Sequence, residues 1–122
     1  MKNLIILQKI EDLIESSNPY LVKFPKAQRF ILASRIEATI DSLFKQAISL
    51  QRKFYKKNTL QEMIINLDAL RGYIRRSYKL KFISAQNYGV WVGYVVEISN
   101  MVWSYYKYTQ EKGRVDLPEK QQ

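Results

Sequence analysis

The sequence predicts an all-α fold, an antiparallel up-down-up-down four-helix bundle. Apolar residues recur every three or four positions along four long segments, which is the spacing of an amphipathic helix. The 122 residues include only 4 glycines and 3 prolines, few for the many turns of an all-β protein. Hydrophobic residues make up 47% of the chain, enough for one core in one domain. The bundle is expected to span residues 1–108.

The first helix is expected from about residue 2 to residue 17. Its apolar positions follow helical spacing and include Ile6, Ile10, Leu13 and Ile14. The helix is expected to break or kink at the Asn18-Pro19 step, because the residue before a proline avoids helical backbone angles, and residues 20–22 are expected to continue as a short turn of helix.

The second helix is expected to start at Pro25 or Lys26 and to run to about Tyr55, with an apolar stripe that includes Phe54. At about 100° per residue, Arg29 projects onto the same face as Leu32. A buried guanidinium without a partner is too costly, so two interpretations of Arg29 stay open. It either forms an ion pair with a carboxylate such as Glu37 or Glu97, or it meets a phosphate or a protein surface.

The third helix is predicted to begin after Asn58. Residues 59–62 read T-L-Q-E, which has the form of a capping box. Arg71 falls on the apolar stripe of this helix and poses the same choice as Arg29. A structural ion pair is the interpretation slightly favoured for Arg71, because it lies in the middle of the helix.

The fourth helix is predicted to start at the N-cap Ser84 and to end near Tyr108. Apolar residues cover roughly twice the width of face that a small bundle needs, which favours burial on more than one side. We therefore expect a subunit interface at Tyr94, Met101 and Tyr105, although these side chains could also simply fill the core. Residues 109–122 lack periodicity and are expected to form a polar, disordered tail.

The composition argues against an enzyme. The chain contains no histidine and no cysteine, which removes the commonest general base, the commonest zinc ligand and the thiolate nucleophile. No metal site and no cofactor are expected. No clean apolar span of about 20 residues is present, and no secretory leader is recognisable, so a cytoplasmic protein without membrane contact is expected.

The net charge of +9 favours an anionic partner such as nucleic acid. In an antiparallel bundle the cations gather at the two ends. The candidate binding residues are Lys23, Lys26, Arg29, Arg71, Arg75, Arg76, Lys79 and Lys81 toward one end, and Arg52, Lys53, Lys56 and Lys57 at the other. The alternative is a set of solvated charges that complement the helix dipoles.

Four stretches carry a resemblance to a known family. They are LIILQKIEDLI (residues 4–14), NPYLVKFPKAQRFILASRIE (18–37), LRGYIRR (70–76) and LKFIS (80–84). The pattern resembles the Avd family, the accessory proteins of diversity-generating retroelements. That family is similar in fold to the four-helix proteins encoded in 23S rRNA intervening sequences.

The resemblance implies a basic four-helix bundle that assembles into a pentameric ring or barrel. It also implies binding of RNA and DNA and association with the reverse transcriptase of the element. That complex copies a template RNA with errors at adenines, and the cDNA replaces a variable region of a target gene. Two alternatives stay open: an RNA-binding protein of the intervening-sequence type without a polymerase partner, and a purely structural interaction module.

Overall fold

The structure, a computed structural model, describes residues 2–116, with side chains over 4–111. This part of the chain contains helices and connecting turns and no strand, so the all-α prediction is confirmed. The elements are α1 (Lys2–Leu21), α2 (Lys26–Arg29), α3 (Leu32–Arg52), α4 (Lys57–Lys79) and α5 (Ala85–Asp116).

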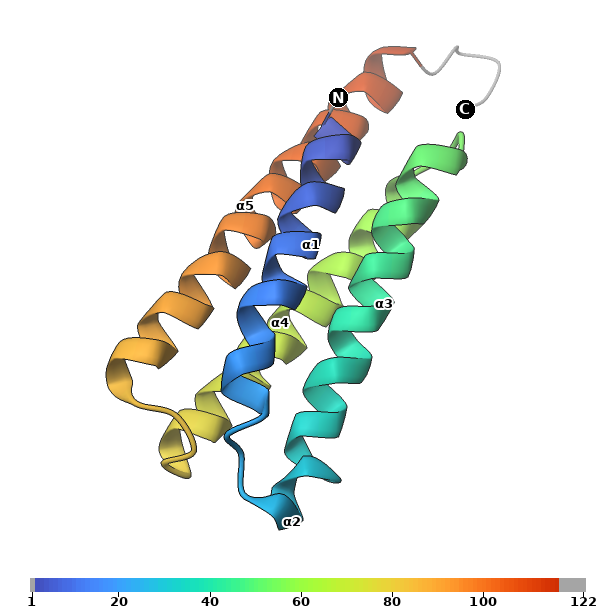
Figure 1. The fold of residues 1–122 in the computed structure, drawn as a ribbon. Coiled ribbons are helices and arrows are strands. Elements are labelled where there is room, and N and C mark those ends of the chain that lie inside the picture. Colours follow the sequence, from blue (N-terminus) through green and yellow to red (C-terminus); the bar gives the residue numbers. More distant parts are fainter. Residues whose placement is uncertain (1, 117–122) are drawn as a thin grey trace.

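The four long helices alternate in direction along the chain (Figure 1). Helix α1 packs against α3 and α5, and α4 packs against the same two helices, so the pairs α1–α4 and α3–α5 lie across the bundle from each other. Short connections favour antiparallel neighbours, because the chain can only turn back on itself. The up-down-up-down order of the single chain follows from these connections.

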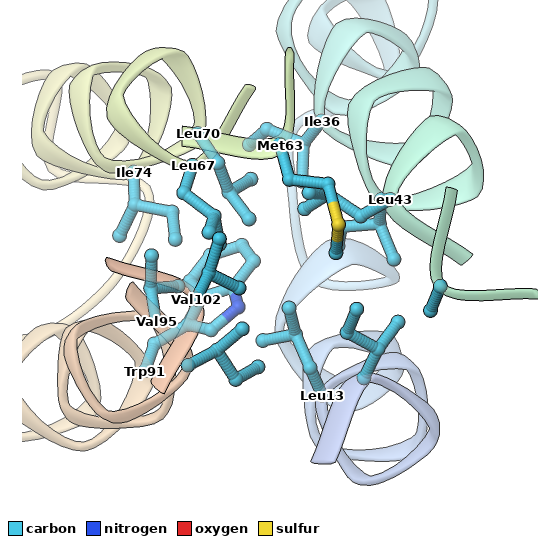
Figure 2. Packing of buried hydrophobic residues seen from close by; sticks show 14 of the residues in the cluster. Leu13, Ile36, Leu43, Met63, Leu67, Leu70, Ile74, Trp91, Val95 and Val102 are labelled. Carbon is cyan, nitrogen blue, oxygen red and sulfur yellow. The ribbon is translucent and has the colours of Figure 1, made fainter. Parts of the chain in front are cut away.

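Buried apolar side chains from all four long helices fill the space between them (Figure 2). Those labelled in Figure 2 are Leu13, Ile36, Leu43, Met63, Leu67, Leu70, Ile74, Trp91, Val95 and Val102. Trp91 is the one tryptophan among them, and its buried indole N–H has a partner. Trp91 Nε1 donates to Ser17 Oγ at 2.8 Å, and Ser17 Oγ donates to the Leu13 carbonyl at 2.6 Å.

Helix α1 continues through Pro19 to Leu21, so there is no break at Asn18-Pro19 and the helical turn expected after it belongs to the same helix. A proline removes the hydrogen bond that its own N–H would make. Because Pro19 lies in the last turn of α1, little helix remains to be disrupted. The amide of Val22 still donates to the carbonyl of Asn18 at 3.1 Å.

The predicted second helix is divided into α2 and α3, so the prediction of one continuous helix from residue 25 or 26 was wrong. Helix α2 ends at Arg29, and α3 begins at Leu32 after an interruption at Phe30 and Ile31. Neither residue is a glycine or proline. Phe24 before the interruption and Leu32 after it are both buried, which indicates that packing decides the path of the chain here.

The sequence predicted the N-cap of α5 correctly but not that of α4. The capping box at Thr59 does not form: the N-cap of α4 is Lys56, without a side-chain cap, and Thr59 is buried inside the helix. The N-cap of α5 is confirmed, because the amide of Asn87 donates to Ser84 Oγ at 3.0 Å.

Helix α5 extends eight residues beyond the expected end of the bundle at residue 108, so residues 109–116 of the expected tail are helical. The rest of that tail, residues 117–122, lies outside the described residues.

Candidate nucleic-acid interface

The candidate basic residues come together at the two ends of the bundle, which Figure 1 shows at opposite tips of the long helices. The α3–α4 end is formed by Arg52, Lys53, Lys56 and Lys57. The α2 end is formed by Lys23, Lys26, Arg29, Arg75, Arg76, Lys79 and Lys81. All of these residues are exposed except Lys56, which is partly buried.

At the α3–α4 end, two lysines of the connecting loop form hydrogen bonds to the loop and to the adjoining helices, and two further cations have no ion-pair partner among the described residues. Lys56 Nζ donates to the carbonyls of Leu50 and Lys53, the former at 2.6 Å. Lys53 Nζ donates to Thr59 Oγ1 at 3.3 Å. An ammonium group at the carboxyl end of α3 is also favoured by the helix dipole. Arg52 and Lys57 form no ion pair within the part of the chain that the structure describes, so their charges face solvent.

At the α2 end, Arg29 does not lie on the apolar stripe, and that prediction was wrong. The interruption between α2 and α3 leaves Arg29 exposed, and its Nη2 donates to the Val22 carbonyl at 2.6 Å, just beyond α1. No ion pair with Glu37 or Glu97 forms among the described residues. Glu97 instead pairs with Lys9 at 3.1 Å. Arg29 therefore binds backbone and still presents its charge to solvent.

Arg71 was also wrongly placed on the apolar stripe of its helix. The buried face of α4 contains Leu70 and Ile74, and Arg71 is exposed. Residues four apart lie on the same side of a helix, so Arg71, Arg75 and Lys79 form one basic ridge. This ridge runs along α4 toward the α2 end.

Lys81 has a left-handed backbone, with φ 67°. The amide of Phe82 donates to the Ser77 carbonyl and the amide of Lys81 to the Tyr78 carbonyl, both at 2.9 Å. This pair of bonds is a Schellman motif, in which the left-handed residue is usually glycine. A lysine at this position adds a cation to the α2 end where a glycine would suit the backbone better.

Sequence reasoning missed the exposure of Phe54, which it placed on the apolar stripe of the second helix. Helix α3 ends at Arg52, so Phe54 falls in the loop and is 85% exposed, beside Tyr55 at 82%. Phe30 at the α2 end is 85% exposed as well. The signal available in the sequence was the run R-K-F-Y-K-K at residues 52–57, because the apolar spacing of the helix does not continue beyond it.

A groove of about 860 Å³ between α1 and α3 has the opposite charge. Glu15, Glu37 and Asp41 line it together with Ile14 and Leu21. The groove lies along the last turns of α1 and the first turns of α3, next to the α2 end. Within the described residues, no group of three or more histidine, cysteine, aspartate or glutamate side chains could hold a metal ion.

The candidate interface residues on α5 are half-buried and pack against the bundle core. They are Tyr94, Met101 and Tyr105. Met101 and Tyr105 also line a shallow hollow of about 300 Å³, opposite Ile5 of α1. Burial, with a smaller contribution from Tyr108, raises the pKa of the Tyr105 phenol. Their role in a subunit interface stays a prediction.

Comparison with known proteins identifies the family. A family model described as bAvd-like matches residues 4–109. The chain belongs to the bAvd-like family. The match includes both basic ends, and it confirms the resemblance seen in the sequence. No curated protein and no solved structure matches the chain.

Membership of the bAvd-like family indicates an accessory, non-catalytic protein of a diversity-generating retroelement. The helices that the structure describes include none that is both long and apolar enough to cross a membrane.

Proposed function

We propose that this protein is a basic, non-catalytic accessory protein of a diversity-generating retroelement. It binds the template RNA and the cDNA and associates with the reverse transcriptase of the element to support mutagenic cDNA synthesis. The observation that carries the proposal is the bAvd-like match over residues 4–109. The two exposed basic ends of the bundle supply the surfaces that such a role needs.

The proposed mechanism is electrostatic positioning. Lysine and arginine side chains that neutralise phosphates release counterions, and this release drives binding. One basic end offers only a few contacts, but a homopentamer would present the same end five times. Linked copies raise the effective concentration for each further contact, so modest patches give strong total binding. The nucleic acid would thereby be held beside the polymerase.

The proposed assembly uses the side of α5 next to its core-facing stripe. This side carries Tyr94, Met101 and Tyr105, which pack against the core and remain partly exposed. Replacing Tyr94 by glutamate places a charge on that side. We expect the Tyr94→Glu protein to keep its helix content and to lose oligomer mass in light scattering. An unchanged mass would remove Tyr94 from the interface.

Co-purification tests the proposed function. The tagged chain is expressed with the reverse transcriptase encoded near it and with the template RNA, and the complex is isolated in moderate salt. We expect the polymerase and the RNA to elute with the chain in constant ratio. Recovery of RNA without polymerase would contradict the retroelement role and favour the intervening-sequence type of protein. Recovery of neither would favour a structural module.

A further inference from the structure

The loop between α3 and α4 exposes two neighbouring aromatic rings. Phe54 is 85% exposed and Tyr55 82% exposed, so neither ring serves the core. Their centroids lie 4.9 Å apart and their planes are nearly perpendicular, at 88°. Exposing two large rings side by side costs free energy that burial would have gained. We call Phe54 and Tyr55 the loop aromatic pair.

The backbone beneath the loop aromatic pair is held in place. The Lys53 amide donates to the Ser49 carbonyl and the Leu60 amide to the Lys56 carbonyl, both at 2.9 Å. The side chain of Lys56 donates to two carbonyls on the α3 side, and that of Lys53 bonds to Thr59 on α4. Both ends of the loop are therefore fixed, and the rings project from a supported backbone.

The charge around the loop aromatic pair is positive on both sides. Arg52 precedes it and Lys57 follows it, and both are exposed without an ion-pair partner among the described residues. A ligand that suits this surface carries negative charge at short intervals and offers flat apolar faces to the rings. Single-stranded nucleic acid has both properties, because its unpaired bases stack on aromatic side chains while its phosphates meet lysine and arginine. In a duplex the base faces are already stacked on each other.

We propose that the loop aromatic pair is a stacking site for the unpaired bases of single-stranded RNA or cDNA, with Arg52 and Lys57 on the adjoining phosphates. The proposal rests on the proposed function, since it takes the nucleic acid of that function as its ligand. It adds that the α3–α4 end selects single strands over duplexes.

The test uses variants that separate ring stacking from apolar contact. The double variant Phe54→Leu with Tyr55→Leu keeps apolar side chains and removes both rings. The double variant Phe54→Tyr with Tyr55→Phe keeps both rings and exchanges the hydroxyl. Phe30→Leu is the matched control, because Phe30 is equally exposed at the other basic end but has no ring partner at stacking distance among the described residues. The parent protein and its three variants have the same net charge at neutral pH.

Binding is measured by fluorescence anisotropy with a labelled oligouridine of about 20 nucleotides and with a mixed-sequence RNA duplex of the same length. We expect the double-leucine variant to bind the single strand at least fivefold more weakly, from typical stacking energies per base. Its duplex affinity, its oligomer mass and its salt dependence should match those of the parent. The ring-exchange variant and Phe30→Leu should both bind within about twofold of the parent, because neither removes a stacked base.

Other results would overturn the inference. Unchanged single-strand binding by the double-leucine variant would remove the stacking site while leaving the proposed function intact. Three further results would each assign the rings another role. They are an equal loss of affinity for single strand and duplex, an equal loss of single-strand affinity in Phe30→Leu, and a lower oligomer mass. A parent protein that binds neither RNA would refute the proposed function itself.

Discussion

Lys81 shows, at the scale of a single residue, how local strain and charge can compete. The turn after α4 needs a left-handed backbone at this position, with φ 67°, and the two hydrogen bonds of the Schellman motif hold it there. A side chain with a Cβ is strained in this conformation, whereas glycine is not. The chain nevertheless places an exposed cation here, at the α2 end.

Replacing Lys81 by glycine should therefore separate stability from binding. We expect the free energy of unfolding to rise by about 0.5–1 kcal/mol, because the relief of strain exceeds the added flexibility of the unfolded chain. RNA binding should weaken by one phosphate contact. Urea denaturation and a binding titration check the two effects, and a less stable Lys81→Gly protein would contradict this view of the turn.

Ser17 is the second residue with a clear energetic role. Its Oγ accepts from the buried Trp91 indole at 2.8 Å and donates to the Leu13 carbonyl. Ser17→Ala would leave the indole N–H buried without a partner, which costs about 1–3 kcal/mol of unfolding free energy. Ser16→Ala on the same helix removes no such bond and is the control. Equal stability of the two variants in chemical denaturation would show that the indole finds another partner.

At the scale of the helices, the sequence predicts whether a segment is helical far better than where it ends. Periodicity identified the four long helices, because each must bury one face. The interruption at Phe30 and Ile31 left no such signal, since neither residue breaks a helix by itself and the burial of Leu32 depends on neighbouring helices. The misplacement of Arg29 followed from that missed interruption.

The error in the predicted end of α3 also hid the exposed rings. Phe54 continues the apolar spacing of α3, but the helix ends two residues earlier, at Arg52. Hydrogen bonds from the loop lysines then hold the backbone in a non-helical conformation. Thr59 failed as a helix cap because α4 begins two residues earlier, at Lys57, so Thr59 already lies in the first turn, where its hydroxyl accepts from Lys53 across the loop. Hydrogen bonds across a turn cannot be predicted from the apolar spacing along one helix.

The α3–α4 connection offers a matched pair of lysines for testing its stability. Lys56 Nζ donates to carbonyls at the end of α3, whereas Lys57 has no side-chain partner among the described residues. Lys56→Met should lower the free energy of unfolding by about 1.5–3 kcal/mol, in line with hydrogen bonds from a charged group. Lys57→Met makes the same change in charge and should stay within about 0.5 kcal/mol, the usual range for an exposed position. Thermal or urea unfolding compares the two, and equal losses would mean that the Lys56 bonds contribute nothing.

At the scale of the whole molecule, the candidate binding cations and one group of acidic residues occupy different surfaces. The candidate cations lie at the two ends of the bundle and along the ridge of α4, while Glu15, Glu37 and Asp41 line the groove between α1 and α3. The two basic ends could be predicted from sequence because the helices finish in lysine and arginine and the order is antiparallel. The acidic groove was not predicted, because it depends on which sides of α1 and α3 meet.

This arrangement predicts steep salt dependence for RNA binding. Each neutralised phosphate of a single strand adds about −0.7 to the slope of log affinity against log salt. Replacing both Arg52 and Lys57 by methionine should make the slope shallower by about 1.4 for each subunit whose α3–α4 end contacts the strand, through the loss of two contacts there. Anisotropy titrations at several salt concentrations measure the slope. A slope near zero for the parent would contradict the electrostatic mechanism.

A role beside the polymerase is tested most sharply by cDNA synthesis on the template RNA by the reverse transcriptase of the element. The yield is compared for the polymerase alone, with this chain, and with a variant that carries glutamate in place of Arg52, Lys57, Arg75 and Lys79. If the chain is the accessory protein of that polymerase, the parent should raise the yield and the charge-reversed variant should not. Equal yields with and without the parent chain would contradict a role as the accessory protein of that polymerase.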